Sequence, residues 1–339
     1  MRLALLSDIH GNLTALEAVL ADIQTRGGVD AYWLLGDFAA MGGQPLAVLE
    51  RIAALPGARF VRGNTDRYAF DGSRPAIEPG DTVPRRYLTL WDSFAWTQGL
   101  LAGSGWREWV GALPLDFTEA LPNGHNALCV HAAPGEDDGV GMRAGMSDDQ
   151  LAPLLAGVEA EWVFVGHTHW PQHRVLGGKH LVNVGSVGLP FTPDALPAYT
   201  LLEATVQGVR LDQRVVDYDP APEIAALERV AHPSRTLIAG LLSGAERFEW
   251  ARAADQAYWH IVFLEGEAVV LTKKHYGHWR RVATDFADYK TSLGPLLPAH
   301  VIAYFRAAHG DDETAWPFTQ TELAAFLESP AQVLRQENR

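Results

Sequence analysis

The stretch LALLSDIHG at residues 3–11 joins a short apolar run to two polar side chains that follow it directly. Leu3–Leu6 has the length and composition of a buried strand, and apolar residues recur at helical spacing from Leu13 onward. Asp8 and His10 therefore stand between the end of a strand and the start of a helix. Further strand and helix patterns alternate along the chain, which indicates an α/β fold built in layers.

Other polar side chains come directly after strand patterns in the same way. They are Asp37 in LLGDF after 31–35, Asn64 in RGN after 59–62, His131 in VHAAP after 127–130, and His167 and His169 in VGHTH after 162–165. Because ligands of open α/β sheets gather at the carboxyl ends of the strands, we expect these side chains to converge. Nitrogen and oxygen donors without thiolate suit Mn, Fe, Co, Ni or Zn, and the sequence does not rank these metals.

The order DIH, GD, GN, an isolated His and GHTH resembles the calcineurin-like metallophosphoesterase superfamily. The stretch LVNVGSVGLP at 181–190 is similar to the segment after GH-x-H in its small bacterial phosphodiesterase and phosphatase branch. The resemblance covers about residues 1–216. It implies a four-layer α/β/β/α sandwich, to which the rest of the chain adds a C-terminal α+β unit. We predict a catalytic domain over 1–219, with an inserted helical or lid segment at 68–126, and a second domain of unknown role over 220–339.

The resemblance also implies a role for each motif residue. Asp8, His10 and His169 would bind one metal, Asn64, His131 and His167 a second, and Asp37 would bridge the two. Asp37, Asn64 and His131 are then the catalytic residues. A metal-bridging hydroxide would attack small-molecule phosphodiesters or phosphomonoesters, with nucleotides among the candidate substrates.

The Gly63-Asn64 pair is followed by Thr65, where many members of the superfamily carry a histidine that protonates the leaving group. A threonine hydroxyl cannot act as a general acid near neutral pH, and such an acid is worth about 10²–10⁴-fold in rate. We therefore expect an enzyme that prefers good leaving groups. For Asp66, next in sequence, we favour a structural role over that of a replacement acid. The small bacterial branch often lacks this histidine too.

Alternative functions stay open on the same motifs. One is a diadenosine-polyphosphate hydrolase or a protein phosphatase that uses this site. Another is a non-catalytic adaptor of the same fold, which retromer-type scaffold subunits exemplify. Such adaptors usually carry broken metal ligands, whereas all seven motif residues are intact here. Metal content after purification separates the adaptor from the enzymes.

Five residues are candidates for substrate binding. Arg67 could meet a phosphate, as could Arg85 and Arg86, and Trp170 and Phe191 could stack on a base or an aryl group. For each of them an ordinary packing or solvated role is the alternative. The basic cluster KKHYGHWRR at 273–281 could steer an anionic substrate, pack on an acidic face of a partner, or form a solvated hairpin end.

Composition excludes several classes of protein. The formal net charge is −14, from 27 basic and 41 acidic residues, and a surface this acidic repels nucleic acid. No apolar run approaches the ~18 residues that a membrane span needs, and MRLALLSD does not have the pattern of a signal peptide. The single cysteine, Cys129, cannot form an internal disulfide. We therefore expect a cytoplasmic protein, and homo-oligomer formation stays open.

The resemblance does not extend to the C-terminal part. Strand patterns at 258–264 and 268–272 flank Glu265-Gly266-Glu267, which predicts a hairpin. A third strand is predicted at 278–283, and two helices are predicted near 295–308 and 321–328.

Overall fold

The structure is a computed structural model, and it describes residues 1–74, 85–246, 259–274, 279–286, 288–296 and 298–336. The chain divides into two compact units. The first comprises Met1–Phe191 and Ala195–Arg247, and the second comprises Thr192–Asp194 and Phe248–Arg339. Among the described residues, no helix combines the length and apolar character that crossing a bilayer requires.

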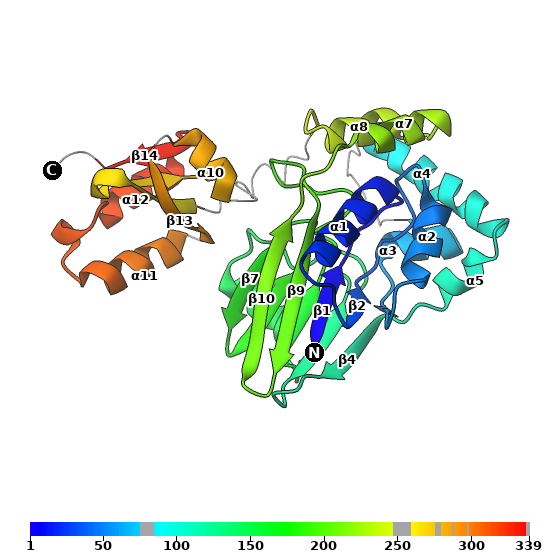
Figure 1. Ribbon diagram of the computed structural model, residues 1–339, viewed down its shortest axis with the longest axis horizontal. Helices are drawn as coiled ribbons and strands as arrows, with labels where there is room; N and C mark the ends of the chain where they lie inside the picture. Colours follow the sequence, from blue (N-terminus) through cyan, green and yellow to red (C-terminus); the bar gives the residue numbers. More distant parts are fainter. Residues whose placement is uncertain (75–84, 247–258, 275–278, 287, 297, 337–339) are drawn as a thin grey trace. The chain divides into compact units, whose positions relative to one another are not determined.

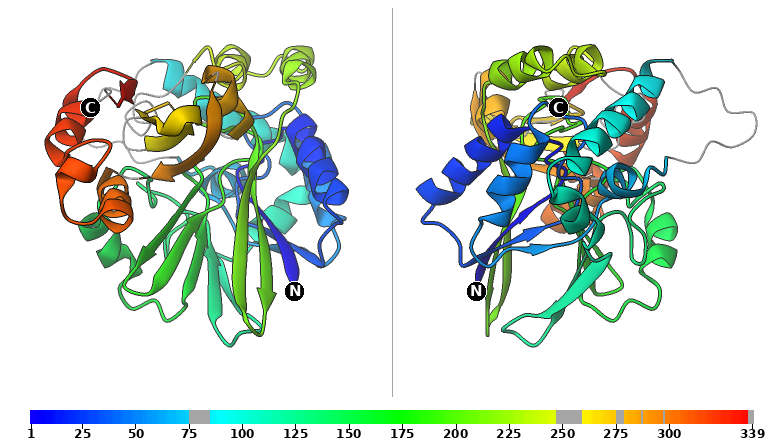
Figure 2. Two further views of the ribbon diagram at one scale, coloured as in Figure 1. Left: turned by 60° about the vertical axis from the view of Figure 1, so that its left-hand side comes forward. Right: turned by 90° about the vertical axis from the view of Figure 1, so that its right-hand side faces the viewer.

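The first unit contains two mixed sheets that face each other (Figures 1 and 2). In spatial order, one sheet is β10 (Gly208–Val215), β9 (Ala198–Thr205), β1 (Arg2–Leu6), β2 (Ala31–Leu34) and β3 (Arg59–Phe60). The other is β4 (Asp116–Ala120), β5 (Asn126–Val130), β6 (Trp162–Val165), β8 (Lys179–Asn183) and β7 (Gln172–Leu176). The strands β1, β2 and β3 are parallel, as are β5, β6 and β8, and the others run antiparallel.

Three apolar clusters show why these elements stack in four layers. The cluster between the sheets joins Leu5 and Trp33 of one sheet to Cys129 and Phe164 of the other. The outer face of the first sheet packs on helices, and the outer face of the second packs on a short helical segment. The helices on the first sheet are α1 (Leu13–Thr25), α2 (Pro45–Ala53), α3 (Asn64–Asp71), α4 (Arg85–Ala102) and α5 (Trp106–Gly111), and those on the second are α6 (Asp148–Leu151) and η1 (Ala152–Leu155). The predicted four-layer sandwich is confirmed.

The predicted boundary at residue 219 differs from the division that the structure shows. Helices α7 (Ala221–Arg229) and α8 (Arg235–Leu242) belong to the first unit. The buried carboxylate of Glu223 accepts hydrogen bonds from the backbone of Gly43 at 2.7 Å and from the side chain of Gln44 at 3.0 Å. The proline-rich segment before α7 therefore connects two parts of one core.

The segment 68–126 is not a separate cap over the described part of the chain. Leu101 of α4 and Val110 of α5 are fully buried in the core on the first sheet, and β4 forms the edge of the second sheet. Residues 75–84 of the predicted lid segment lie outside the described residues.

The second unit is a sheet with helices on both faces. Its strand order is β13 (Tyr289–Leu296), β11 (Trp259–Leu264), β12 (Val269–Thr272) and β14 (Val333–Arg335), and the 3₁₀ turns η2 (Glu265–Glu267) and η3 (Glu313–Ala315) lie in its loops. Helices α11 (Pro298–His309) and α12 (Gln320–Glu328) share one core with the sheet, and α10 (Trp279–Asp285) packs in another. The predicted hairpin and terminal helices are present, but the strand expected at 278–283 is wrong because most of that segment forms α10.

Candidate metal centre

The motif residues lie where the sheets end, as their positions after apolar strands predicted. Asp8 and His10 follow β1, Asp37 follows β2, and Asn64 begins α3 after β3. In the second sheet, His131 follows β5, and His167 and His169 follow β6. The structure brings all seven side chains together, although 159 positions separate His10 from His169 in the chain.

The backbone at these positions is strained. Five of the seven residues have positive φ, namely Asp8 (53°), His10 (48°), Asp37 (58°), His167 (63°) and His169 (55°). Non-glycine residues rarely adopt this region, and such strain concentrates at functional sites. Two glycines make the close approach feasible, because a Cβ on Gly63 would lie 2.1 Å from Asp37 Oδ1 and one on Gly166 would lie 1.9 Å from Ser7 Oγ.

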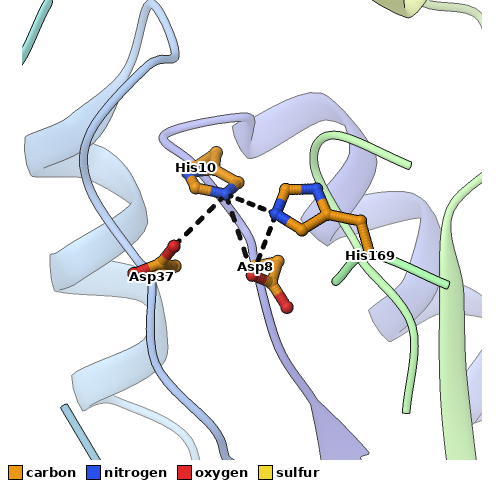
Figure 3. Close-up of side chains that lie close together, drawn as sticks. All are labelled: Asp8, His10, Asp37 and His169. Atoms are coloured by element: carbon orange, nitrogen blue, oxygen red, sulfur yellow. Dashed lines mark hydrogen bonds and ion pairs between the residues drawn. The ribbon is translucent and has the colours of Figure 1, made fainter. Parts of the chain in front are cut away.

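One half of the centre contains Asp8, His10, Asp37 and His169, whose donor atoms all lie within 4.8 Å of one another (Figure 3). His169 Nε2 is 3.1 Å from Asp8 Oδ1 and 3.2 Å from His10 Nε2. Asp37 Oδ2 is 3.6 Å from His10 Nε2. Each of these side chains is almost fully buried.

The other half contains Asn64, His131 and His167. Asn64 Oδ1 lies 3.2 Å from His131 Nε2 and 3.1 Å from His167 Nδ1. The same Asp37 Oδ2 lies 3.4 Å from His131 Nε2. Asp37 is therefore the residue that faces both halves, which is the position a bridging ligand requires.

Backbone carbonyls orient all four imidazoles. Three rings use Nδ1 to contact a carbonyl and turn Nε2 toward the centre, whereas His167 uses Nε2 and turns Nδ1 inward. The acceptors are Ala40 for His10 (3.1 Å), Leu35 for His131 (2.5 Å), Leu189 for His169, and Gly139 for His167 (2.9 Å). A ring nitrogen that donates to a carbonyl leaves the other nitrogen with a lone pair when the ring is neutral.

Lone pairs therefore converge at one point. With His169 Nδ1 donating to Leu189, its Nε2 cannot also donate to Asp8 Oδ1, which is buried without a hydrogen-bond partner. His10 Nε2 faces the same point. Buried acceptors that face one another need a cation between them. The residues present thus fit a divalent metal ion, and their nitrogen and oxygen donors suit a transition metal.

Burial and mutual charge shift the pKa values of the cluster strongly. Burial lowers the pKa of His10 to about 4. Burial also acts to lower the pKa of His131, but the carboxylates of Asp37 and Asp8 outweigh it and raise that pKa to about 10. For Asp37, burial opposes ionisation, yet His131 and its other histidine neighbours hold the pKa of the carboxyl well below its usual range. In the metal-free protein His131 is therefore protonated at neutral pH, and its positive charge balances the buried carboxylates of Asp37 and Asp8.

Asp66 lies beneath the centre rather than at its surface. It is fully buried, and its oxygens accept the backbone N–H groups of Asp37 (2.7 Å), Phe38 (2.9 Å) and Gly63 (3.0 Å). Burial and the charge of Asp37 raise the pKa of Asp66 to about 7, which by itself would suit a general acid. Because both oxygens bond to the backbone, the geometry supports the structural role that we favoured.

Thr65 contributes its backbone to the site. Its N–H donates to Asp37 Oδ1 at 2.9 Å. Its side-chain hydroxyl is buried and makes no hydrogen bond. A hydroxyl shielded in this way cannot contact a leaving group.

Only some of the residues predicted to bind substrate lie beside the centre. The guanidinium of Arg67 pairs with Asp137 and Asp138 at 3.1 and 2.9 Å, so its charge is already neutralised. Trp170 is 1% exposed and packs inside the fold. Phe191 is half-buried and stacks on His169 with ring centroids 4.2 Å apart, so it lies beside the centre. The side chains of Arg85 and Arg86 lie outside the described residues.

The predicted basic cluster at 273–281 does not form a continuous patch in its described part. Lys273 is buried and donates to the carbonyls of Leu327 and Ser329 at the end of α12. Lys274 pairs with Asp285 at 2.8 Å. The side chains of 275–281 lie outside the described residues.

Sequence reasoning missed two residues that lie next to a predicted ligand or to a group that binds one. Tyr68 is buried beside Asn64, and Asp138 lies next to Gly139, whose carbonyl accepts from His167. Neither residue stands at a strand end or in a ligand-like spacing, so no signal in the sequence singled them out.

Comparison with known proteins agrees with this architecture. The model of the calcineurin-like phosphoesterase superfamily domain matches residues 1–206. A metallophosphoesterase from Sphaerobacter thermophilus is 25% identical, with a TM-score of 0.57 over 72% of this chain and 99% of that chain. A hypothetical protein from Pyrococcus horikoshii is 20% identical, with a TM-score of 0.61 over 71% and 97% of the two chains, and shows the fold alone.

Sequence relatives include proteins with and without a described activity. An uncharacterized protein of Methanocaldococcus jannaschii is 28% identical over 205 residues, which is 56% of this chain and 76% of the relative. A symmetrical bis(5'-nucleosyl)-tetraphosphatase of Pectobacterium carotovorum is 41% identical over 63 residues, which is 18% of this chain and 22% of the relative. The match to the tetraphosphatase thus spans about a fifth of that protein.

Proposed function

Since the chain belongs to the calcineurin-like phosphoesterase superfamily, we propose that it is a divalent-metal-dependent phosphoesterase that hydrolyses small phosphodiesters or phosphomonoesters. The observation that carries this proposal is the convergence of buried lone pairs at the ends of the two sheets. His169 Nε2, His10 Nε2 and Asp8 Oδ1 face one another with no proton available between them, provided that the rings are neutral.

Two metal positions are consistent with the geometry. Asp8, His10 and His169 would hold one ion, and Asn64, His131 and His167 would hold the other. Asp37 would contact both, since its Oδ2 lies 3.6 Å from His10 Nε2 and 3.4 Å from His131 Nε2. When bound, such a pair of ions lowers the pKa of water and neutralises charge on the phosphoryl oxygens.

The chain's own residues orient this chemistry, but neither of the two residues that follow Asn64 presents an acid to the centre. The Thr65 hydroxyl is buried, and both oxygens of Asp66 bond to backbone N–H groups. The departing oxygen must therefore leave with little help from a side chain at this position. We expect turnover to fall steeply as the pKa of the leaving group rises.

Hydrolysis of bis-p-nitrophenyl phosphate tests the proposal. Purified protein is assayed with Mn²⁺ and with chelator, and turnover that the chelator abolishes is expected. The variant Asp37→Asn removes the bridging charge and is expected to lose at least about 10²-fold, because several kcal/mol of charge stabilisation disappear. Glu119→Gln, which breaks the ion pair between Glu119 and Arg59 on the sheet edges, is the matched control.

The other outcomes have defined meanings. Absence of turnover despite two bound Mn²⁺ ions would contradict the choice of substrate. Absence of both turnover and metal binding would contradict the enzyme and favour an adaptor of this fold. Activity on p-nitrophenyl phosphate, measured alongside, decides between diester and monoester preference.

A nucleoside polyphosphate is the second candidate substrate. Support comes from the 63-residue similarity to symmetrical bis(5'-nucleosyl)-tetraphosphatases and from Phe191, a half-buried aromatic ring next to a predicted ligand. An aromatic ring in this place can stack on a base. Release of nucleoside diphosphate from diadenosine tetraphosphate, faster than hydrolysis of the aryl diester, would establish this candidate.

A further inference from the structure

The metal position of Asn64, His131 and His167 depends on how the His167 ring is turned. Asn64 Oδ1 lies 3.1 Å from His167 Nδ1 and 3.2 Å from His131 Nε2. His167 offers a lone pair beside that oxygen only when Nδ1 faces inward without a proton.

Tyr68 holds the carboxylate of Asp138. Tyr68 is fully buried, and its hydroxyl donates to Asp138 Oδ2 at 2.5 Å. A phenol has one hydrogen to donate, and a carboxylate can only accept. The hydroxyl of Tyr68 therefore fixes the place of Asp138 Oδ2.

The same carboxylate also acts on His167. Asp138 Oδ1 accepts the backbone N–H of Gly139 at 2.7 Å, and the carbonyl of Gly139 accepts from His167 Nε2 at 2.9 Å. This contact fixes the tautomer of His167 with its lone pair on Nδ1, which faces Asn64 Oδ1 at 3.1 Å. Hydrogen bonds thus run from Tyr68 through Asp138 and Gly139 to His167, a predicted ligand.

Arg67, which lies on α3, forms an ion pair with Asp138. Its Nη2 lies 2.9 Å from Asp138 Oδ2 and 3.1 Å from Asp137 Oδ1, and Arg62 Nε holds Asp137 at 2.7 Å. These ion pairs connect α3, which begins with Asn64, to the loop that contains Gly139. The charge of Arg67 therefore stabilises the connection rather than a substrate phosphate.

The ligands of the other metal position do not depend on this connection. His10 and His169 donate to the carbonyls of Ala40 and Leu189, in loops that follow β2 and β8. Asp8 accepts the backbone N–H of His167 through Oδ2, while Oδ1 faces the centre. A change at Tyr68 or Asp138 should therefore affect one position and spare the other.

We propose that Tyr68 and Asp138 are positioning residues that set the orientation of His167, and thereby the affinity of the metal position that His167 shares with Asn64 and His131. The inference rests on the proposed dinuclear centre, and it makes the two positions separable by mutation. Partners of this kind behind a ligand typically change metal affinity by about 10–100-fold.

Isothermal titration calorimetry of the chelator-treated protein with Mn²⁺ tests this inference. The wild type is expected to bind two ions. Tyr68→Phe and Asp138→Asn should weaken the binding of one ion by about 10–100-fold and leave the other within about twofold. The matched control is Tyr199→Phe, because the buried hydroxyl of Tyr199 donates to Asp22 at 2.7 Å in the same kind of pair, between β9 and α1.

Unchanged affinities for both ions in Tyr68→Phe would overturn the inference while leaving the proposed function intact. An equal loss of both ions, with a lower melting temperature of the metal-free variant than Tyr199→Phe shows, would reduce Tyr68 to a structural residue and also overturn it. Absence of Mn²⁺ binding by the wild type would instead overturn the proposed function and this inference together.

Discussion

The backbone N–H of Asp37 donates a 2.7 Å hydrogen bond to the carboxylate of Asp66, so the side chain of Asp66 holds the loop that contains Asp37. Asp66 also binds the N–H of Gly63, the residue before Asn64. Through these contacts it connects the ends of β2 and β3, where a predicted bridging ligand and a predicted terminal ligand lie.

Replacing Asp66 by Asn should therefore act through structure. An amide can accept these hydrogen bonds less well than a carboxylate, and its N–H₂ group meets backbone donors, so we expect a loss of about 1–3 kcal/mol in the free energy of unfolding. Turnover of aryl phosphates should decline by the same factor for good and poor leaving groups. A loss confined to poor leaving groups, with metal retained, would instead identify Asp66 as the general acid.

Thr65→Val should leave turnover unchanged and stabilise the protein. The Thr65 hydroxyl is buried without a hydrogen bond, and valine fills nearly the same volume without a polar atom. Removing an unsatisfied buried hydroxyl is expected to raise the free energy of unfolding by about 1 kcal/mol. Urea denaturation measures the gain. A loss of activity in this variant would show that the hydroxyl takes part in the reaction.

Metal binding should strengthen as the pH rises. Asp37 and Asp8 outweigh burial and raise the pKa of His131 to about 10, so metal-free protein carries a proton there at neutral pH. That proton must leave before Nε2 can bind a metal, whereas burial lowers the pKa of His10 to about 4 and keeps that ring neutral. The apparent affinity for Mn²⁺ should therefore rise about tenfold per pH unit between pH 7 and 9.

Calorimetry in buffers of different protonation enthalpy measures the protons released on metal binding. About one proton per protein is expected at pH 8 from His131. A metal affinity that does not change with pH would contradict the protonated state of this ring.

Glu223→Ala should destabilise the first unit although position 223 lies beyond the residues that match the family model. The substitution leaves the buried N–H of Gly43 without its acceptor, which costs about 1–3 kcal/mol in the free energy of unfolding. Glu223→Gln retains a carbonyl acceptor and serves as the matched variant, with a smaller expected loss. Equal stability of all three proteins in urea would show that α7 is not part of this core.

His232 should make the protein sensitive to acid. It is fully buried, its Nδ1 accepts the N–H of Ser234 at 3.2 Å, and its Nε2 lies 3.2 Å from Ser93 Oγ. Burial, with a contribution from Arg235, lowers its pKa to about 4. Because the unfolded chain binds this proton more readily, stability is lost as the pH falls from about 6.5 to 4, by on the order of 2–3 kcal/mol.

Denaturation of wild type and His232→Gln at pH 7, 5.5 and 4.5 checks the acid sensitivity. Glutamine offers an acceptor to Ser234 and does not titrate, so the variant should lose less stability between these pH values than the wild type. Parallel losses in the two proteins would assign the acid sensitivity to other groups.

The main strands and the candidate ligands could be predicted from local patterns. Apolar runs such as Leu3–Leu6 and Trp162–Val165 become β1 and β6, and the polar residues just after them meet at one end of the sheets. Because both faces of these strands are buried, their sequences are continuously apolar, and a strand is the structure that fits them. The central strands are parallel, so their carboxyl ends lie at the same edge of the sheet. The strands that were missed, β4, β7, β13 and β14, lie at the edges of their sheets, where polar residues are tolerated.

Segments with weaker patterns depended on tertiary contacts. Most of 278–283 is apolar and basic without clear periodicity, and it becomes α10, with Val282 buried against the sheet of the second unit. A domain boundary was predicted at residue 219, yet Glu223 binds the loop at Gly43 and keeps α7 in the first unit. In both cases contacts with residues distant in sequence outweighed local preference.

The sequence by itself determined which donor atoms meet, because strand order and strand ends depend on hydrophobic pattern and motif position. Only the tertiary structure decided how those atoms are held. The carbonyls that orient each histidine, and the hydrogen bonds from Tyr68 through Asp138 and Gly139 to His167, join segments distant in the chain. Hydrogen-bond geometry of this kind depends on distances of a few tenths of an ångström, and spacing along a sequence carries no information on that scale.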